Sequence, residues 1–371
     1  MGSSAEYGPP PSGTDIKTDR QACDVLTPKK EQPVNCLERT QKSIRGERID
    51  QIPNFPILLA PACQLVGIKQ RDYNLDPDVM ADTLIRARDL IGADGIYVSR
   101  DNWVYHEALG GKLIFPEDDE SYSKEPILDS LREYRKLQVP DPQTALGMKT
   151  LLAAAKKVVR EVGDRYYIQA NIDCGPFSLA AVLRGAQPFL LDLVTEDEKQ
   201  LHELLEFCTE VVIAYGRAMI STGVHAVQYG DSTASLISPE HYERFALPYQ
   251  QRSVDALTGR NCDIWIHICG NTEHLLHFLR PLNIQGFEVD AKVEMGSARK
   301  LLGESIAIKG NLDTTFLLQR SPQEVYEATQ GILRSGDFKT GIIMSPGCGV
   351  PRMTPLENLK AMTRACKDYR L

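Results

Sequence analysis

Three segments decide the fold class: PEHYERFALPYQQRSVDALTG (residues 239–259), DIWIHICG (263–270) and GFEVD (286–290). The first has the apolar spacing of a helix, and the other two are short apolar runs typical of buried strands. The same alternation extends outward, back to YYIQANI (166–172) and forward to GIIMSPGCG (341–349). Short strands separated by helices indicate parallel strands with helical crossovers. About eight such units in roughly 300 residues predict an α/β protein with a (β/α)8 TIM barrel, and an open doubly wound sheet is the alternative.

The composition is that of a globular protein, with 371 residues, 42% hydrophobic and 25% charged. The formal net charge of −8 and the lack of a long basic run argue against a nucleic-acid partner. No run of about 18 apolar residues predicts a membrane helix. The N-terminus does not read as a signal peptide, and the nine cysteines are scattered and odd in number. We therefore expect a cytoplasmic protein with free thiols.

The pattern divides the chain into two parts. Residues 1–35 are polar and rich in Pro, Gly and Ser, which predicts a flexible N-terminal arm. Residues 36–371 are expected to form the single barrel, with a charged, Pro-rich loop at 116–145 and a helix at 272–283. No GxGxxG follows the first strand and no GxxxxGK[ST] loop occurs, which argues against an α/β fold that binds a dinucleotide or a nucleotide. A homodimer is left open.

Polar residues follow most of the predicted strands. In a barrel, chemistry takes place where strands end and loops begin, and buried polar groups without partners are costly. We therefore expect these side chains to gather at one barrel mouth, with some serving as helix caps or loop anchors. They are Asp101, Asn171, Asp173, Asp231, His267, Cys269, Glu288, Asp290, Asn311, Asp313 and Cys348.

A His and two Cys form the first candidate group. His267 and Cys269 are two apart on a predicted strand, so their side chains point the same way. Cys348 follows 79 residues later (348 − 269), between Gly347 and Gly349, which allow close backbone approach. One imidazole and two thiolates form a zinc donor set that leaves a fourth position open. On spacing alone, ordinary buried thiols are the stronger interpretation.

Four carboxylates are the next candidates. Glu288 and Asp290 share one face of the following strand, so either could take the fourth zinc position or orient a ligand, and a salt bridge to a helix cap is the alternative. Asp101 and Asp231 are candidate general bases or substrate anchors. Capping or loop fixing is the alternative for both, and it is favoured for Asp231.

Neutral polar and aromatic side chains complete the expected mouth. Asn171, at the end of its strand, is a substrate-binding candidate together with Asp231. Trp103, Tyr105 and Phe115 are placed to form an aromatic rim, although such residues also occur for packing alone.

The chain resembles the uroporphyrinogen decarboxylase superfamily over nearly its whole length from about residue 36. The resemblance is carried by GPFSLA (175–180), VQYGDSTASLISPEHYERFALPY (227–249), HICGNT (267–272), GNLDTT (310–315) and SPGCGVPRMTPLENLKAM (345–362). It implies a (β/α)8 barrel.

Two branches of the superfamily differ in motifs. Decarboxylases carry an arginine-rich motif after the first strand, whereas the corresponding stretch here is APACQLVGIKQR (60–71), and they have Gly-His where this chain has Gly-Cys at 347–348. The early aspartate of the family corresponds to Asp101. The zinc-dependent, corrinoid-linked methyltransferases carry His-x-Cys and a later Cys, which His267, Cys269 and Cys348 match.

The resemblance implies one Zn²⁺ per chain and a catalytic site that includes Asp290, with Glu288 as its rival for the glutamate of the coenzyme M enzymes. It further implies methyl transfer between a small substrate and the cobalt of a corrinoid. The substrate is a methoxylated aromatic or other methyl donor, which we slightly favour, or a thiol acceptor such as coenzyme M. No Asp-x-His-x-x-Gly motif occurs, so the corrinoid is expected on a partner protein. A tetrapyrrole decarboxylase and a non-enzymatic binding subunit with a structural zinc are the alternatives.

Overall fold

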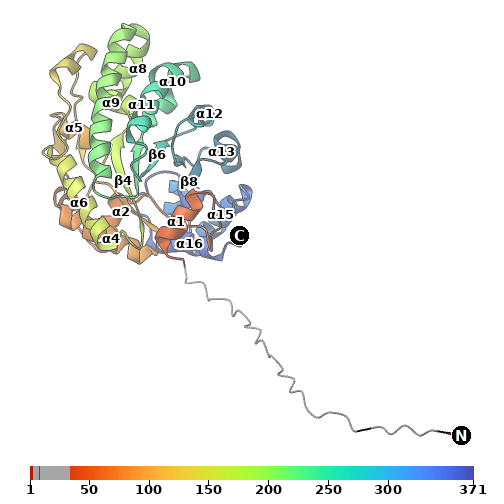
Figure 1. Cartoon of the computed structure of the whole chain (residues 1–371). Coiled ribbons are helices and arrows are strands. Elements are labelled where there is room, and N and C mark those ends of the chain that lie inside the picture. The colour runs from red at the N-terminus through yellow and green to blue at the C-terminus, as the bar shows by residue number, and fades with distance from the viewer. Residues whose placement is uncertain (3–7, 9–33) are drawn as a thin grey trace. The chain divides into compact units, whose positions relative to one another are not determined.

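Seven parallel strands form a curled sheet at the centre of the molecule (Figure 1). They are hydrogen-bonded in the order β1-β4-β5-β6-β7-β8-β9, so strands that follow one another along the sheet also follow one another in the chain. The computed structural model describes residues 1–2, 8 and 34–371, and nearly all of the expected arm lies outside these residues. The strand bounds are β1 Gly95–Val98, β4 Tyr167–Cys174, β5 Ala226–Gly230, β6 Asp263–Ile268, β7 Gly286–Val289, β8 Ala307–Leu312 and β9 Ile342–Pro346.

An irregular segment, residues 53–58, closes the sheet into a ring. The Phe55 N–H donates to the Met344 carbonyl (2.8 Å), and the Met344 N–H donates to the Pro53 carbonyl (2.8 Å). On the other side, the Asp94 N–H donates to the Asn54 carbonyl (2.7 Å). The segment therefore occupies the eighth strand position between β9 and β1, with one isolated bridge between Asn54 and Met344. The predicted (β/α)8 barrel is confirmed.

Helices surround the ring (Figure 1). The long crossover helices α6 and α9 precede β4 and β5, as the apolar spacing predicts. A small hairpin, β2 Leu113–Ile114 with β3 Tyr122–Ser123, and two 3-10 helices, η1 Leu131–Lys136 and η2 Ser232–Leu236, lie in the loops. The α-helix bounds are α1 Cys36–Ile44, α2 Ala60–Val66, α3 Gln70–Leu75, α4 Pro77–Ile91, α5 Val104–Ala108, α6 Leu146–Val162, α7 Pro176–Arg184, α8 Ala186–Thr195, α9 Glu198–Ile220, α10 Pro239–Phe245, α11 Leu247–Leu257, α12 Leu276–Leu279, α13 Met295–Leu302, α14 Thr314–Gln319, α15 Pro322–Ser335 and α16 Leu356–Asp368.

Two expected helices differ from the structure. The helix predicted over 239–259 is two helices, α10 and α11, because Pro248 lies in the first turn of α11 and cannot donate a backbone hydrogen bond to the preceding turn. The helix predicted over 272–283 is reduced to the four residues of α12.

Strand alternation separates the two sides of the barrel wall. Ile264 and Ile266 belong to the large core under the helices, whereas Trp265 packs with residues of other strands inside the ring. The residues of this inner cluster form an apolar floor, which comprises Ile44, Phe55, Ile57, Tyr97, Tyr167, Ala226, Trp265, Ala307 and Ile343. Polar side chains lie further along the same strands. The interior is therefore closed at one end and polar towards the carboxyl ends of the strands.

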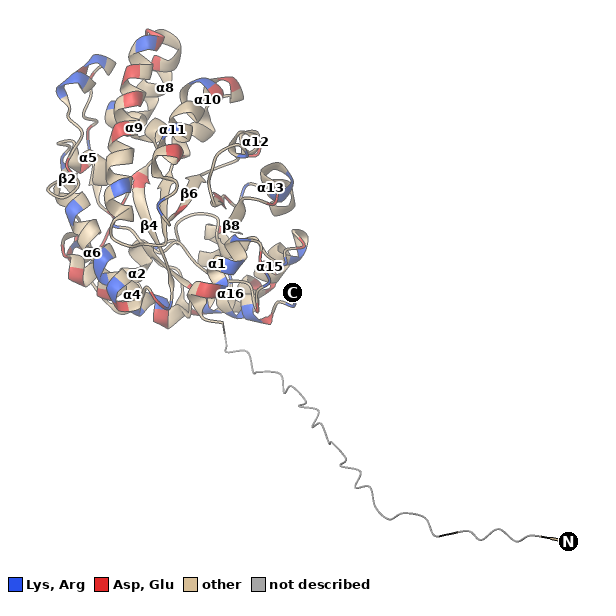
Figure 2. Cartoon of the chain, viewed as in Figure 1, with Lys and Arg blue, Asp and Glu red and all other residues tan. Residues whose placement is uncertain are grey.

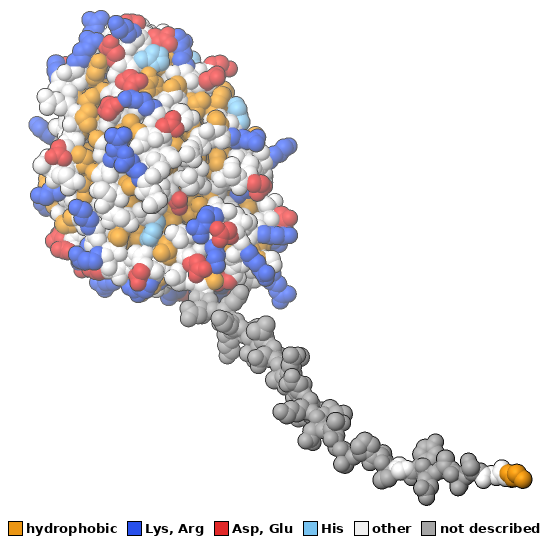
Figure 3. Space-filling model, viewed as in Figure 1, with side chains coloured by type: hydrophobic (Ala, Val, Ile, Leu, Met, Phe, Trp, Pro, Cys, Tyr) orange, Lys and Arg blue, Asp and Glu red, His pale blue; other side chains and the backbone are white. Residues whose placement is uncertain are grey.

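Charged side chains lie on the outer helices, where both signs are interspersed (Figures 2 and 3). Within the described residues, no single helix has the length and apolar character to cross a membrane. The pair α7 and α8 meets that test jointly, with a bend of 105° between them.

Candidate metal centre

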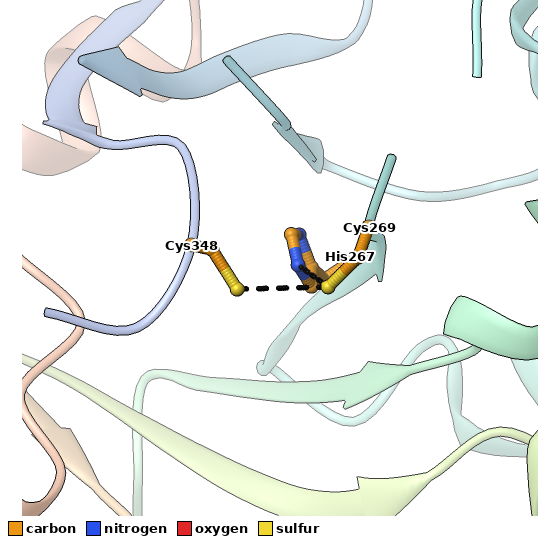
Figure 4. A group of neighbouring side chains, drawn as sticks. All are labelled: His267, Cys269 and Cys348. Atoms are coloured by element: carbon orange, nitrogen blue, oxygen red, sulfur yellow. Dashed lines mark hydrogen bonds between the residues drawn. The ribbon is translucent and has the colours of Figure 1, made fainter. Parts of the chain in front are cut away.

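Three potential metal ligands converge at the carboxyl ends of the strands (Figure 4). His267 lies on β6, Cys269 directly follows that strand, and Cys348 lies in the turn after β9. The His267 Nε2 is 2.9 Å from the Cys269 Sγ, which is 3.5 Å from the Cys348 Sγ. One ligand atom from each residue lies within 4.8 Å of the others. The structure thus brings together the three residues that the sequence predicts as a metal site.

A backbone hydrogen bond orients the imidazole. The His267 Nδ1 lies 3.0 Å from the Glu288 carbonyl oxygen, which can only accept, so Nδ1 carries a proton. This leaves Nε2 facing the cysteines. Metal-binding histidines commonly show this arrangement, in which the second ring nitrogen is held by a carbonyl or a carboxylate.

The turn that holds Cys348 depends on a glycine. A Cβ at Gly347 would meet the Ala291 backbone nitrogen at 2.4 Å and the Asp290 carbonyl carbon at 3.1 Å. The turn after β9 therefore packs directly on the backbone that follows β7. This close approach brings the Cys348 thiol to the end of β6.

The three groups influence one another's pKa values. Burial on its own would lower the pKa of His267, but contacts with Cys348 and Glu288 raise it to about 9. A hydrogen bond between the thiols is the main cause of a lowered pKa at Cys269 and a raised pKa at Cys348. The two thiols are therefore inequivalent, with Cys269 the more readily ionised of the pair. A bound metal ion would replace the thiol protons.

A buried ion pair lies beside the cluster. The Lys309 Nζ donates to the Glu288 Oε1 (2.9 Å) and to the Gln169 Oε1 (2.8 Å), and it lies 4.0 Å from the centre of the Phe55 ring. Burial lowers the pKa of Lys309. The second Glu288 oxygen, Oε2, lies 3.9 Å from the His267 Nδ1 and has no hydrogen-bond partner among the described residues. Glu288 therefore contributes negative charge behind the imidazole.

Asp290, the first candidate for a fourth ligand, has another role. Its Oδ2 accepts the Gly270 N–H (2.8 Å), and its Oδ1 accepts the Lys292 N–H (2.9 Å). Both oxygens thus hold the loops after β6 and β7. Asp290 and Glu288 lie outside the group of three ligands.

The cluster opens into a cavity of about 340 Å³. Besides the three ligands, neutral side chains form most of its wall. The lining residues are Ile57, Leu59, Tyr97, Asn102, Trp103, Asn171, Asp173, Cys174, Ser178, Val182, Gln228, Gly230, Ser232, Thr233, His267, Cys269, Glu288, Cys348 and Gly349. Asn171 and Trp103 therefore lie where the sequence predicts substrate-binding residues.

The prediction that Tyr105 lines the mouth is wrong. Tyr105 is fully buried, outside the cavity, with its ring packed edge-on against Tyr215. The reason is local: α5 begins at Val104, so the chain after Trp103 turns into a helix and directs Tyr105 into the core.

Asp101 and Asp231 also lie outside the cavity wall. Asp101 is held by Arg100 (Nε to Oδ2, 2.9 Å) and by the Ser121 hydroxyl (2.5 Å). Asp231 is fully buried and accepts the Ser178 N–H (2.7 Å), as well as the Gln250 side-chain amide (2.8 Å). Asp231 thus fixes the first turn of α7, in agreement with the capping alternative.

Sequence reasoning gave no role to four residues that shape the interior. Tyr97 and Gln228 join Asn171 in a hydrogen-bonded group on the cavity wall, with a Tyr97 Oη to Gln228 Oε1 distance of 2.6 Å. Lys309 lies beneath that wall, and Asp173 was noted only as a polar strand end. The inward alternation on β4, β5 and β8 was the available signal.

Comparisons with known proteins identify the family of the chain. The profile of the uroporphyrinogen decarboxylase family matches residues 36–369. The chain belongs to the uroporphyrinogen decarboxylase family. The methylcobamide:CoM methyltransferase MtbA of Methanosarcina mazei is 35% identical over 341 residues, which cover 90% of this chain and 98% of that protein. The methylated-thiol–coenzyme M methyltransferase of the same organism is 27% identical over 336 residues, covering 89% and 88%.

Decarboxylases of the family are also similar. The uroporphyrinogen decarboxylase of Chloroherpeton thalassium is 29% identical over 301 residues, which cover 79% of this chain and 84% of that protein. Among solved structures, a methyltransferase from Methanosarcina mazei has a TM-score of 0.81 at 23% identity, covering 89% of this chain and 98% of that one, which supports the fold. The predicted membership in the methyltransferase branch is confirmed, and so is the prediction of a corrinoid-dependent methyltransferase.

Proposed function

We propose that the chain is a zinc-dependent enzyme that moves a methyl group between a small substrate and the cobalt of a corrinoid carried by a separate protein. The convergence of His267, Cys269 and Cys348 on one open cavity carries this proposal. The similarity to methylcobamide:CoM methyltransferases over 90% of the chain supports the corrinoid as the reaction partner.

The donor set fits zinc. Two thiolates and one imidazole are preferred zinc ligands, and two thiolates on a tetrahedral zinc are about 3.8 Å apart, close to the 3.5 Å between the Cys269 and Cys348 sulfurs. When bound, zinc supplies a Lewis acid that lowers the pKa of a sulfur or oxygen ligand in the open position. Both Asp290 oxygens hold backbone N–H groups, and Glu288 lies outside the group of three ligands with one oxygen paired to Lys309, so we assign the open position to the substrate.

The residues of the chain prepare this chemistry. The Glu288 carbonyl fixes the His267 ring, and Gly347 brings Cys348 into place. With a thiol substrate, the thiol would release its proton to solvent, its sulfur would form the new sulfur–carbon bond as the cobalt–carbon bond breaks, and cobalt would keep the electron pair. With a methyl ether, Co(I) supplies the electron pair of the new cobalt–carbon bond, and the leaving oxygen keeps the C–O pair and takes a proton. Ile57 and Leu59 provide apolar surface for the methyl group.

Metal analysis of the purified protein tests the zinc. The expected result is about one zinc per chain, and most of it is lost in Cys348→Ser. Cys262→Ser is the matched control, because Cys262 precedes β6 at the end opposite Cys269. Retention of zinc by Cys348→Ser would contradict the site.

Cobalt spectroscopy tests the reaction. Zinc-loaded protein is mixed with methylcobalamin and thiols, or with cob(I)alamin and methoxylated aromatics, and the cobalt oxidation state is followed. We expect transfer in one of the two directions, and its absence with every donor and acceptor would refute the function. The tetrapyrrole decarboxylase has less support, because residues 60–70 contain no arginine where the family resemblance places the arginine-rich motif of decarboxylases. The cytoplasmic location and a homodimer stay predictions.

A further inference from the structure

The metal cavity borders a second hollow at Trp103. The second cavity, of about 230 Å³, shares Trp103, Val182 and Thr233 with the first and extends to the β2–β3 hairpin. The proposed metal ligands line the first cavity only. A substrate whose sulfur or oxygen lies at the metal therefore places its remote end beside the other walls of the metal cavity.

The described residues that line the metal cavity include no Lys or Arg. They include two carboxylates, Asp173 and Glu288. Glu288 is balanced by Lys309, but that ammonium is itself buried behind the wall and bonded to Glu288 and Gln169. The second cavity contributes one residue of each sign, Lys124 and Glu125.

Among the described residues, Asp173 has no cationic hydrogen-bond partner. Its Oδ2 accepts the Tyr105 N–H (2.8 Å), and its Oδ1 lies 3.1 Å from the Cys174 thiol. Arg100 acts on Asp173 only at longer range, because its guanidinium is paired with Asp101 and Glu107. Burial raises the pKa of Asp173 to about 6, so the side chain is mainly ionised at neutral pH. A negative substrate group in the metal cavity would be repelled by this charge.

We infer that the small substrate is uncharged or cationic at the end remote from the metal, and that Asp173 is a specificity-determining residue that disfavours anionic substrates. The inference rests on the proposed function and names its substrate class. It separates this chain from an enzyme for coenzyme M, whose thiol carries a sulfonate. Trp103 supplies the aromatic surface that a neutral ring or a cation prefers.

Substrates that differ only in the charge of the remote group test the inference. We compare 2-mercaptoethanesulfonate, 2-mercaptoethanol and cysteamine as acceptors from methylcobalamin, and guaiacol with vanillate as donors to cob(I)alamin. In the wild type, we expect kcat/KM to be at least about tenfold higher for 2-mercaptoethanol than for the sulfonate. Asp173→Asn should reduce this kcat/KM ratio about fivefold or more. Comparing the same ratio in the wild type and in the variant cancels the intrinsic reactivity of each thiol.

The matched control is Asp164→Asn. Asp164 precedes the same strand, β4, at its opposite end and is exposed, so its replacement removes an equal charge far from the cavity and should leave the ratio unchanged. A wild-type preference for the sulfonate, or a ratio that Asp173→Asn does not change, would overturn the inference while methyl transfer itself stands.

Calorimetric binding of the three thiols to zinc-loaded protein tests the charge preference separately from the proposed methyl transfer. Tighter binding of 2-mercaptoethanol than of the sulfonate, without any methyl transfer, would uphold the charge preference and refute the proposed function. Equal or tighter binding of the sulfonate would refute the charge preference, whatever the turnover.

Discussion

At the scale of the residue, Asp173 is held in an unfavourable state. Its φ of 68° lies in the left-handed region, which non-glycine residues seldom adopt, and its carboxylate is buried. Residues of this kind persist where surrounding structure fixes them, and they are concentrated at functional sites. The Tyr105 N–H and the Cys174 thiol hold the side chain here.

Asp173→Asn should stabilise the fold at neutral pH. Asn tolerates the left-handed conformation and carries no charge to bury. The pKa of Asp173 is about 6 in the folded chain against a reference value of 3.8, so the folded state keeps the proton longer and loses stability as pH rises from about 4 to 6. We expect the variant to gain about 1–3 kcal/mol at pH 7.5 and almost nothing at pH 4, measured by urea unfolding. An equal gain at both pH values would contradict this.

Removing one partner of the buried Glu288–Lys309 pair should destabilise the fold more than replacing both partners. Lys309→Met leaves the Glu288 carboxylate uncompensated, and we expect a loss of about 3–5 kcal/mol in unfolding free energy. The double variant Lys309→Met with Glu288→Gln should recover most of that loss. If the double variant is as unstable as the single one, lost packing rather than unpaired charge is the cause.

Side-chain alternation predicts that His267 and Cys269 lie on one face, and parallel strands that end at one mouth allow Cys348 to join them. Spacing alone favours ordinary buried thiols, and the family resemblance is needed to single out these three residues as candidate metal ligands. The position of Tyr105 could not be predicted from sequence. The direction of its side chain depends on the residue at which α5 begins, and sequence patterns do not fix a helix start to a single residue. Asp231 and Asp290 show a second limit: a carboxylate at a strand end serves a backbone N–H or a ligand equally well, and only the neighbouring loops decide.

At the scale of the element, the turn after β9 is the part that tolerates least change. Gly347→Ala should cost about 1–3 kcal/mol and reduce zinc content, because the new methyl group meets the Ala291 backbone, which cannot move aside easily. Gly349→Ala is the control in the same turn, since its methyl group meets only the Leu59 side chain, at 3.3 Å. Equal zinc loss in both would show that the turn as a whole, rather than this contact, governs the site.

Most strands and long helices follow from apolar spacing, but the segment 53–58 does not. Its residues are largely apolar, yet Pro53 and Pro56 lack the N–H groups that a regular ladder needs. Its closing hydrogen bonds join the backbones of Pro53, Asn54 and Phe55 to partners far away in the chain, Asp94 and Met344. Ring closure thus depends on long-range contacts that local patterns do not contain.

At the scale of the whole molecule, an ion-pair group built on the buried Arg39 and Asp94 ties α1 to the ring. The Arg39 guanidinium binds Asp94 (2.6 Å) and Asp50 (2.6 Å), and the second Asp94 oxygen accepts the Asn54 N–H (2.8 Å). The group therefore fastens α1 and the closing segment to the start of β1.

Arg39→Met should weaken the entire fold. Removing the cation leaves Asp94 buried without its charge partner, and a loss of about 3–5 kcal/mol is expected in urea unfolding, with an unchanged m-value. Arg45→Met, directly after α1, is the control, because its pair with Glu47 is exposed and such pairs contribute little. A comparable loss in the control would argue against the ring connection.

The position of Cys348 links the closure of the barrel to the candidate metal site. The thiol stands two residues beyond β9, which lies at the seam where the segment 53–58 seals the barrel. If the proposed zinc is bound, we expect its third ligand to depend on this seam, because β9 positions Cys348 and is itself held by the segment 53–58. Release of zinc would then report that the ring has opened, before the rest of the fold is lost.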